Sequence, residues 1–132
     1  MSEGGCFCGN VRIKSTGEIQ AKKITGSTYS TNIIVPGDGF SVTKGKPKEI
    51  SVKADSGNQI TSYFCGDCGS TLWRQGATFG DARIIKVGVM DDIEALEQAQ
   101  PAVELYAPER VSWVGAVAGA GQKKAMPDSA EV

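Results

Sequence analysis

Four cysteines in two close pairs are the feature that most constrains how this 132-residue chain folds. Cys6 and Cys8 flank one residue, Cys65 and Cys68 flank two, and a glycine follows each pair. Two short cysteine hairpins far apart in sequence are typical of a closed tetrahedral thiolate site for Zn²⁺. Because the chain has no histidine and no fifth cysteine, we expect one ion to use all four cysteines. No sulfur or imidazole is then left for a second metal or a nucleophile.

Other interpretations of the cysteines stay open at this stage. Cys65 and Cys68 could form a disulfide of the kind found in redox motifs, whereas a bridge between Cys6 and Cys8 would be strained. Alternatively, the four are small buried apolar residues, and four thiolates suit iron as well as zinc. We predict a shared structural zinc ion, because the glycine after each pair lets backbone N–H groups turn toward the sulfurs.

Length and charge limit the class of protein. The chain is long enough for one domain with a core of its own. Its formal net charge of −1 argues against a non-specific binder of nucleic acid or of a membrane, which needs a strongly basic face. No apolar run approaches the ~20 residues of a membrane span, and Met1–Gly5 lacks the features of a signal peptide. We expect a cytoplasmic or nuclear protein, where paired cysteines more often hold metal than form disulfides.

Short segments rich in β-branched residues, separated by glycine and proline turns, predict a mainly β single domain of short antiparallel strands. The expected strands are Asn10–Lys14, Thr31–Val35, Phe40–Thr43, Glu49–Lys53, Gln59–Phe64, Thr71–Arg74, Arg83–Val89 and Val103–Tyr106. At most one or two short helices are expected.

One helix is predicted between Asp91, which would cap it, and Pro101, which would end it. Its apolar face would consist of Ile93, Leu96 and Ala99. The domain is expected to cover residues 1–114. Residues 115–132 have almost no large apolar side chain, so we expect a mobile C-terminal tail.

The segments around the cysteines resemble the glutathione-dependent formaldehyde-activating enzyme family, which also contains centromere protein V. The matching segments run in order over about Gly4 to Trp113 and are Gly5–Val11, Phe64–Ser70, Gly88–Asp92 and Arg110–Trp113. The resemblance implies a zinc-stabilised β-tent fold. It also implies a carbon–sulfur lyase resembling S-(hydroxymethyl)glutathione synthase, with a small thiol adduct such as a glutathione conjugate as its partner.

The chain departs from the family pattern at one place. The family has a Cys-His-Cys-x-x-Cys segment after the first strand, which carries a second, catalytic zinc. Here Ile19–Lys22 resembles the stretch before that segment and Lys23–Ser30 resembles the stretch after it. The join near Lys22–Lys23 therefore resembles a deletion of the catalytic loop. A catalytic zinc needs about three protein ligands and an open fourth position, so we expect no second zinc, and no catalytic residue can be assigned.

Three hypotheses about function follow from this departure. The first is a zinc protein that keeps the structural site and is inactive as a lyase. The second is an active carbon–sulfur lyase whose catalytic loop is absent from this form of the sequence. The third is a non-catalytic zinc fold that binds another molecule, with nucleic acid disfavoured by the neutral charge.

Several other residues have a structural interpretation that we favour over a functional one. Lys44, Lys46 and Lys48, together with Lys53, could form a basic stripe, but lysines commonly lie on exposed strands. Trp113 could stack on Arg110, but we expect it to close the edge of the core. Ser27 and Tyr29 have no base near them in sequence, so neither is expected to be a nucleophile.

Overall fold

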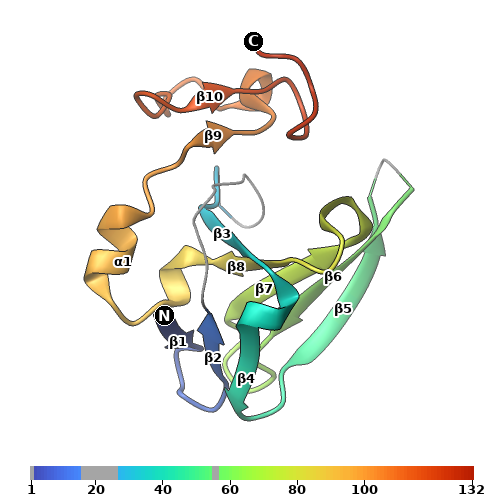
Figure 1. Ribbon diagram of the computed structural model, residues 1–132, viewed down its shortest axis with the longest axis vertical. Helices are drawn as coiled ribbons and strands as arrows, with labels where there is room; N and C mark the ends of the chain where they lie inside the picture. The colour runs from blue at the N-terminus through green and yellow to red at the C-terminus, as the bar shows by residue number, and fades with distance from the viewer. Residues whose placement is uncertain (1, 16–26, 55–56) are drawn as a thin grey trace.

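The computed structural model describes residues 2–15, 27–54 and 57–132. Their strands form two antiparallel sheets and one short parallel pair (Figure 1). The smaller sheet has the order β1-β2-β4 and consists of β1 (Ser2–Gly5), β2 (Arg12–Ser15) and β4 (Phe40–Lys44). The larger has the order β3-β8-β7-β6-β5. Its strands are β3 (Asn32–Val35), β5 (Lys48–Lys53), β6 (Gln59–Phe64), β7 (Thr71–Gly76) and β8 (Arg83–Lys86). The prediction of a mainly β single domain is confirmed.

The expected strands occur with small shifts at their ends. The largest difference is the segment Arg83–Val89, of which only Arg83–Lys86 is a strand. The backbone N–H of Val87 donates to the carbonyl of Thr31 at 3.1 Å, and the N–H of Met90 then returns to the carbonyl of Val87 at 3.1 Å. This second bond closes a 3₁₀ turn over Val87–Val89, so the chain leaves the sheet earlier than its β-branched composition indicates.

The two sheets share one hydrophobic core. Trp73 of β7 stacks on Tyr63 of β6, with ring centroids 4.4 Å apart and planes at 5°. Phe40, at the start of β4, meets the same indole at 4.8 Å and so links the smaller sheet to the larger. The buried residues of this core come from both sheets, from the loops between them and from the end of α1. They are Cys6, Val11, Ile13, Ile33, Val35, Cys65, Leu72, Trp73, Ile85, Val87, Met90 and Ala99.

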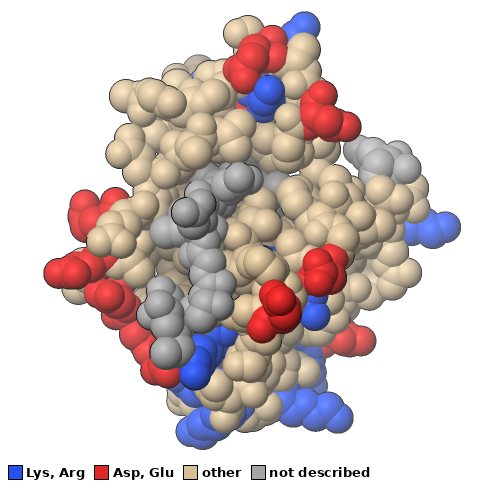
Figure 2. All heavy atoms as spheres, in the orientation of Figure 1, with Lys and Arg blue, Asp and Glu red and all other residues tan. Residues whose placement is uncertain are grey.

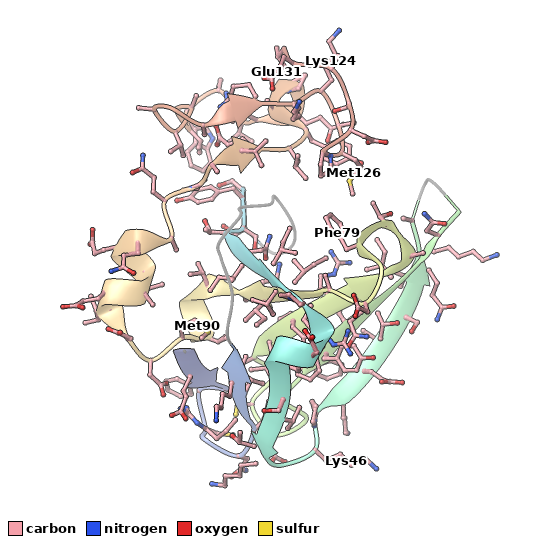
Figure 3. The ribbon with its side chains drawn as sticks, in the orientation of Figure 1. Lys46, Phe79, Met90, Lys124, Met126 and Glu131 are labelled. Carbon is pink, nitrogen blue, oxygen red and sulfur yellow. The ribbon has the colours of Figure 1, made fainter. Side chains whose placement is uncertain are left out.

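The strand β1 was not predicted, because its sequence is rich in glycine. Gly4 forms an isolated antiparallel bridge with Met90, and the N–H of Asp91 donates to the carbonyl of Glu3 at 2.9 Å. Figure 3 shows Met90 close to this strand, at the end of the segment that follows β8. β1 pairs with β2 along its length. It is also held by residues almost ninety positions away, which local composition does not reveal.

The predicted helix is present as α1 (Ile93–Gln98), but its cap and its buried face differ from expectation. Asp92, and not Asp91, caps it by accepting a hydrogen bond from the N–H of Glu94 at 2.9 Å. Ile93 is 73% exposed and Leu96 is 40% exposed, whereas Ala95 and Ala99 are buried. A six-residue helix lies against the core through its small side chains, so the expected apolar face was wrong for Ile93 and Leu96. Among the described residues, no helix is long and apolar enough to cross a membrane.

The C-terminal segment lies above β3 in Figure 1 and contains the parallel pair β9 (Val103–Glu104) and β10 (Gly121–Gln122). The amides of Gly121 and Lys123 donate to the carbonyls of Ala102 and Glu104, both at 2.9 Å. Lys123 also forms an ion pair with Glu131, labelled near this end in Figure 3. The domain boundary at residue 114 and the mobility of the tail stay predictions. Hydrogen exchange of these two amides would test them.

Candidate metal centre

The first cysteine hairpin connects β1 to β2. The N–H of Cys6 donates to the carbonyl of Val11 at 3.1 Å, and the N–H of Gly9 donates to the carbonyl of Cys6 at 3.2 Å. Gly9 has a φ of 80°, a left-handed conformation that glycine adopts at little cost. The turn also directs the N–H of Val11 to the Cys6 sulfur, at 3.3 Å. The hairpin thus supplies a sulfur and a backbone donor to that sulfur together.

The second hairpin connects β6 to β7 and has a similar geometry. The N–H of Cys65 donates to the carbonyl of Ser70 at 2.9 Å, and the N–H of Gly69 donates to the carbonyl of Cys65 at 2.8 Å. Gly69 has a φ of 79°. The N–H of Asp67 points to the Cys65 sulfur at 3.4 Å. Gly9 and Gly69 therefore act as predicted from the sequence, because each lets the backbone of its hairpin turn around a cysteine.

Contacts between the hairpins bring all four sulfurs together. The Sγ atoms of Cys6 and Cys8 are 3.5 Å apart, and those of Cys8 and Cys65 are 3.6 Å apart. The Sγ atoms of the four cysteines, Cys68 included, all lie within 4.8 Å of one another. Zn–S bonds of about 2.3 Å in a tetrahedron place the sulfurs about 3.8 Å apart. The donor set and its spacing therefore fit a metal ion, and both pairs face the same point.

The site has a buried side and an open side. Cys6 and Cys65 are buried, and Cys8 and Cys68 are exposed. All four are free thiols with no disulfide among them. The exposure of Cys8 and Cys68 also argues against the interpretation of the cysteines as simple apolar core residues.

The cysteine thiols of the cluster differ in pKa, because their hydrogen-bond donors and neighbouring sulfurs differ. A hydrogen bond from the Ser70 hydroxyl, together with backbone N–H donors, lowers the pKa of Cys68 to about 5. For Cys8, a backbone hydrogen bond from Asn10 lowers the pKa, but burial and the three neighbouring sulfurs outweigh it and raise the pKa to about 12. Four thiolates this close repel one another, and a divalent cation removes that repulsion.

The comparisons with known proteins agree with this geometry. The family model described as glutathione-dependent formaldehyde-activating enzyme matches residues 1–109. The chain belongs to that family. Comparison with curated proteins gives no match. A crystal structure of a Rhodobacter sphaeroides protein aligns with a TM-score of 0.60 and 13% sequence identity. It covers 75% of this chain and 96% of its own chain, and at that identity the likeness shows the fold alone.

The family's second metal site has no ligands of the expected kind in this chain. Among the described residues, the four cysteines are the only group of three or more cysteine, histidine, aspartate or glutamate side chains placed to hold an ion. The 132-residue sequence has no other cysteine and no histidine. The join expected near Lys22–Lys23 lies outside the described residues.

The other residues singled out from the sequence have mixed outcomes. Lys44, Lys46 and Lys48 are exposed. Lysine and arginine side chains gather at the lower end of the molecule in Figure 2, where Figure 3 labels Lys46. The interpretation as a solvated face is therefore confirmed. The expectation for Trp113 was wrong, because its side chain is 74% exposed. Arg110 instead pairs with Glu104, at 2.9 Å.

Two basic residues, Arg74 and Lys86, were missed from the sequence. They occur in strands whose other residues are largely apolar or neutral, and the chain does not show locally that both lie on one face of the sheet. The only signal was a charge inside an expected strand, in Thr71–Arg74 and in Arg83–Val89. Such charges usually point to solvent, so the pattern favoured the wrong environment.

Proposed function

We propose that this protein holds one structural Zn²⁺ ion on Cys6, Cys8, Cys65 and Cys68, and that it lacks the catalytic zinc of its family. The observation that carries the first part is the spacing of the four sulfurs, all within 4.8 Å. The donors to Cys6 and Cys65 from the backbone support it, because such N–H groups offset the negative charge of a four-thiolate site. Zinc is favoured over iron by availability and geometry.

A four-cysteine site is closed, and this determines what it can do. When all four positions around the ion are taken by protein sulfurs, no position is left for a substrate thiol. A catalytic zinc in this family would lower the pKa of such a thiol. No other cysteine or histidine is present to hold a second ion. We therefore expect the ion to stabilise the fold and the protein not to convert formaldehyde and glutathione.

The metal content and the activity of the purified protein test the two parts separately. Elemental analysis should give ~1 zinc per chain. The consumption of formaldehyde with glutathione should stay at the rate of a sample from which the protein is omitted. A value of two ions per chain, or turnover above that background, would contradict the proposal. The variant Cys8→Ser, which removes an exposed sulfur, should lower the metal content and serves as the matched control.

A carbon–sulfur lyase acting on a thiol adduct is the second candidate. It is favoured by a cavity of about 290 Å³ that includes Tyr29, Ser30 and Thr31, just after the join near Lys22–Lys23. A pocket of this size accepts a small molecule. If the lyase is the active form, the intact mass of the natural protein should exceed that of this sequence by several residues, with additional thiols that titrate after denaturation.

A further inference from the structure

The strand β5 forms one edge of the larger sheet. Within the described part of the chain, it pairs with β6 on one side and with no strand on the other. Figure 1 shows it at the outer margin of the sheet. All six of its residues are exposed. The edge of a sheet presents backbone donors and acceptors that another strand can pair with.

The register with β6 determines which backbone groups of β5 face outward. The N–H of Ala54 donates to the carbonyl of Asn58 at 2.8 Å, and this pair continues the register of Lys53 with Gln59. Hydrogen-bonded and non-hydrogen-bonded pairs alternate along an antiparallel ladder. The even-numbered residues of β5 therefore bond to β6, and the odd-numbered residues direct their N–H and C=O groups away from it. These outward-facing residues are Glu49, Ser51 and Lys53.

The side chains of β5 alternate between two faces of the sheet. Ile50 and Val52 lie on one face, where they are 58% and 52% exposed. Ile60, which pairs with Val52 across to β6, lies on the same face and extends the apolar surface. Glu49 and Lys53 lie on the other face and carry opposite charges. The edge thus combines exposed aliphatic side chains with one charge of each sign.

A second copy of the same strand, turned antiparallel about a two-fold axis at Ser51, matches this pattern. The outward-facing residues of the two copies then meet in hydrogen-bonded pairs, with Ser51 opposite Ser51. Each Glu49 lies opposite Lys53 of the other copy, and each Ile50 lies opposite Val52. Opposite charges and aliphatic side chains that face each other directly stabilise a pair of strands.

We propose that β5 pairs with β5 of a second copy, so that two five-stranded sheets join into one across a two-fold axis. A dimer with this symmetry uses the same surface on both copies. A register shifted by two residues keeps the hydrogen-bonding pattern but removes both contacts between Glu49 and Lys53, so charge complementarity selects the register. The strand β5 contains no cysteine, and the inference does not depend on the proposed metal function.

Sedimentation velocity of the purified protein over a range of concentrations tests the inference. The average mass should rise from that of one 13.8 kDa chain toward twice that value as the concentration increases from about 1 µM to about 1 mM. A mass that stays at one chain over this range would overturn the proposal and would favour a strand of a different protein as the occupant of the edge.

Charge reversal tests the register. Glu49→Lys and Lys53→Glu each bring like charges together twice, so each variant should bind itself at least about tenfold more weakly. An equimolar mixture of the two variants should form a dimer, because every lysine then meets a glutamate. Lys124→Glu makes the same charge change at an exposed position of the C-terminal segment (Figure 3) and should leave dimerisation unchanged. Single variants that still dimerise, or a mixture that stays monomeric, would overturn the assigned surface and register.

Amide hydrogen exchange locates the interface in the unmodified protein. The N–H groups of Glu49, Ser51 and Lys53 should exchange more slowly as the concentration rises. Those of Ile50 and Val52 should change less, because they already bond to β6. A dimer in which the three outward-facing amides show no protection that depends on concentration would overturn the pairing of β5, even if a charge variant folds poorly.

Discussion

The side-chain amide of Asn10 donates a hydrogen bond to the carboxylate of Asp67 at 2.8 Å, joining two cysteine hairpins that are 57 residues apart in sequence. A second bond beside it runs from the N–H of Phe7 to the hydroxyl of Ser70 at 3.1 Å. Neither pair contributes a sulfur. Both connect the two hairpins and so support the relative position in which the four sulfurs meet.

Removal of the bond between Asn10 and Asp67 should weaken the metal site without removing a ligand. We expect Asn10→Ala and Asp67→Ala each to lower zinc affinity by about tenfold, as is common for groups that position metal ligands. Competition with a chromogenic chelator measures this. Asp38→Asn, at an exposed position on a distant turn, is the control and should bind zinc as the unmodified protein does. Equal affinity in all three variants would show that the hairpins need no such link.

Removal of the metal should unfold much of the protein. If the ion is structural, its binding and folding are one equilibrium, with a contribution on the order of 10 kcal/mol. We expect a strong chelator to abolish the strand signal in circular dichroism and added zinc to restore it. Cys65→Ser, which changes a buried ligand, should be more damaging than Cys68→Ser at an exposed one. A strand signal that survives complete removal of zinc would contradict a structural role.

The two tryptophans should respond very differently to substitution. Trp73 is 4% exposed and contacts Tyr63 and Phe40, whereas Trp113 is 74% exposed. We expect Trp73→Ala to lower the free energy of unfolding by about 3–5 kcal/mol, and Trp113→Ala to change it by less than about 0.5 kcal/mol. Chemical denaturation followed by circular dichroism measures both. Similar losses in the two variants would mean that Trp113 packs against something in solution.

Acid should weaken the contact between the N-terminal sheet and the segment before α1. Arg12 forms an ion pair with Asp91, and the hydrogen bond from Arg12 lowers the pKa of Asp91 below its usual 3.8. A lowered carboxyl pKa stabilises the folded state above about pH 4, and this contribution is lost as the pH falls through the folded value. The effect should be small, because both groups are partly exposed.

Comparison with Asp91→Asn isolates this contribution. The difference in stability between the two proteins should be constant from pH 7 to about 5 and should shrink below pH 4. The chemical shift of the side-chain carboxyl carbon of Asp91, followed by NMR, should give a pKa below the usual value for aspartate. A difference that grows on acidification would reverse the sign and contradict the assignment.

Much of the fold follows from local patterns in the chain. The strand Gln59–Phe64 appears with the expected bounds, because turn residues on each side limit where a β-branched run can pair. The spacing of the cysteine pairs predicted that the four sulfurs would come together, because two cysteine hairpins, each followed by a glycine, are typical of a shared metal site. Local patterns failed where a side chain had two possible partners. Asp91 was the predicted cap, but it pairs with Arg12, and its neighbour Asp92 caps the helix.

The sequence alone determined the chemistry that is available: four sulfurs, no imidazole, and hairpins able to present two sulfurs each. Only the tertiary structure decided which side chains share an environment. It placed Trp113 in solvent and brought Arg74 and Lys86 to one inner face, because burial depends on what packs over a strand and not on the strand's own residues. The meeting of the four cysteines could therefore be predicted from spacing, whereas the shared face of Arg74 and Lys86 became visible only once β7 and β8 were paired.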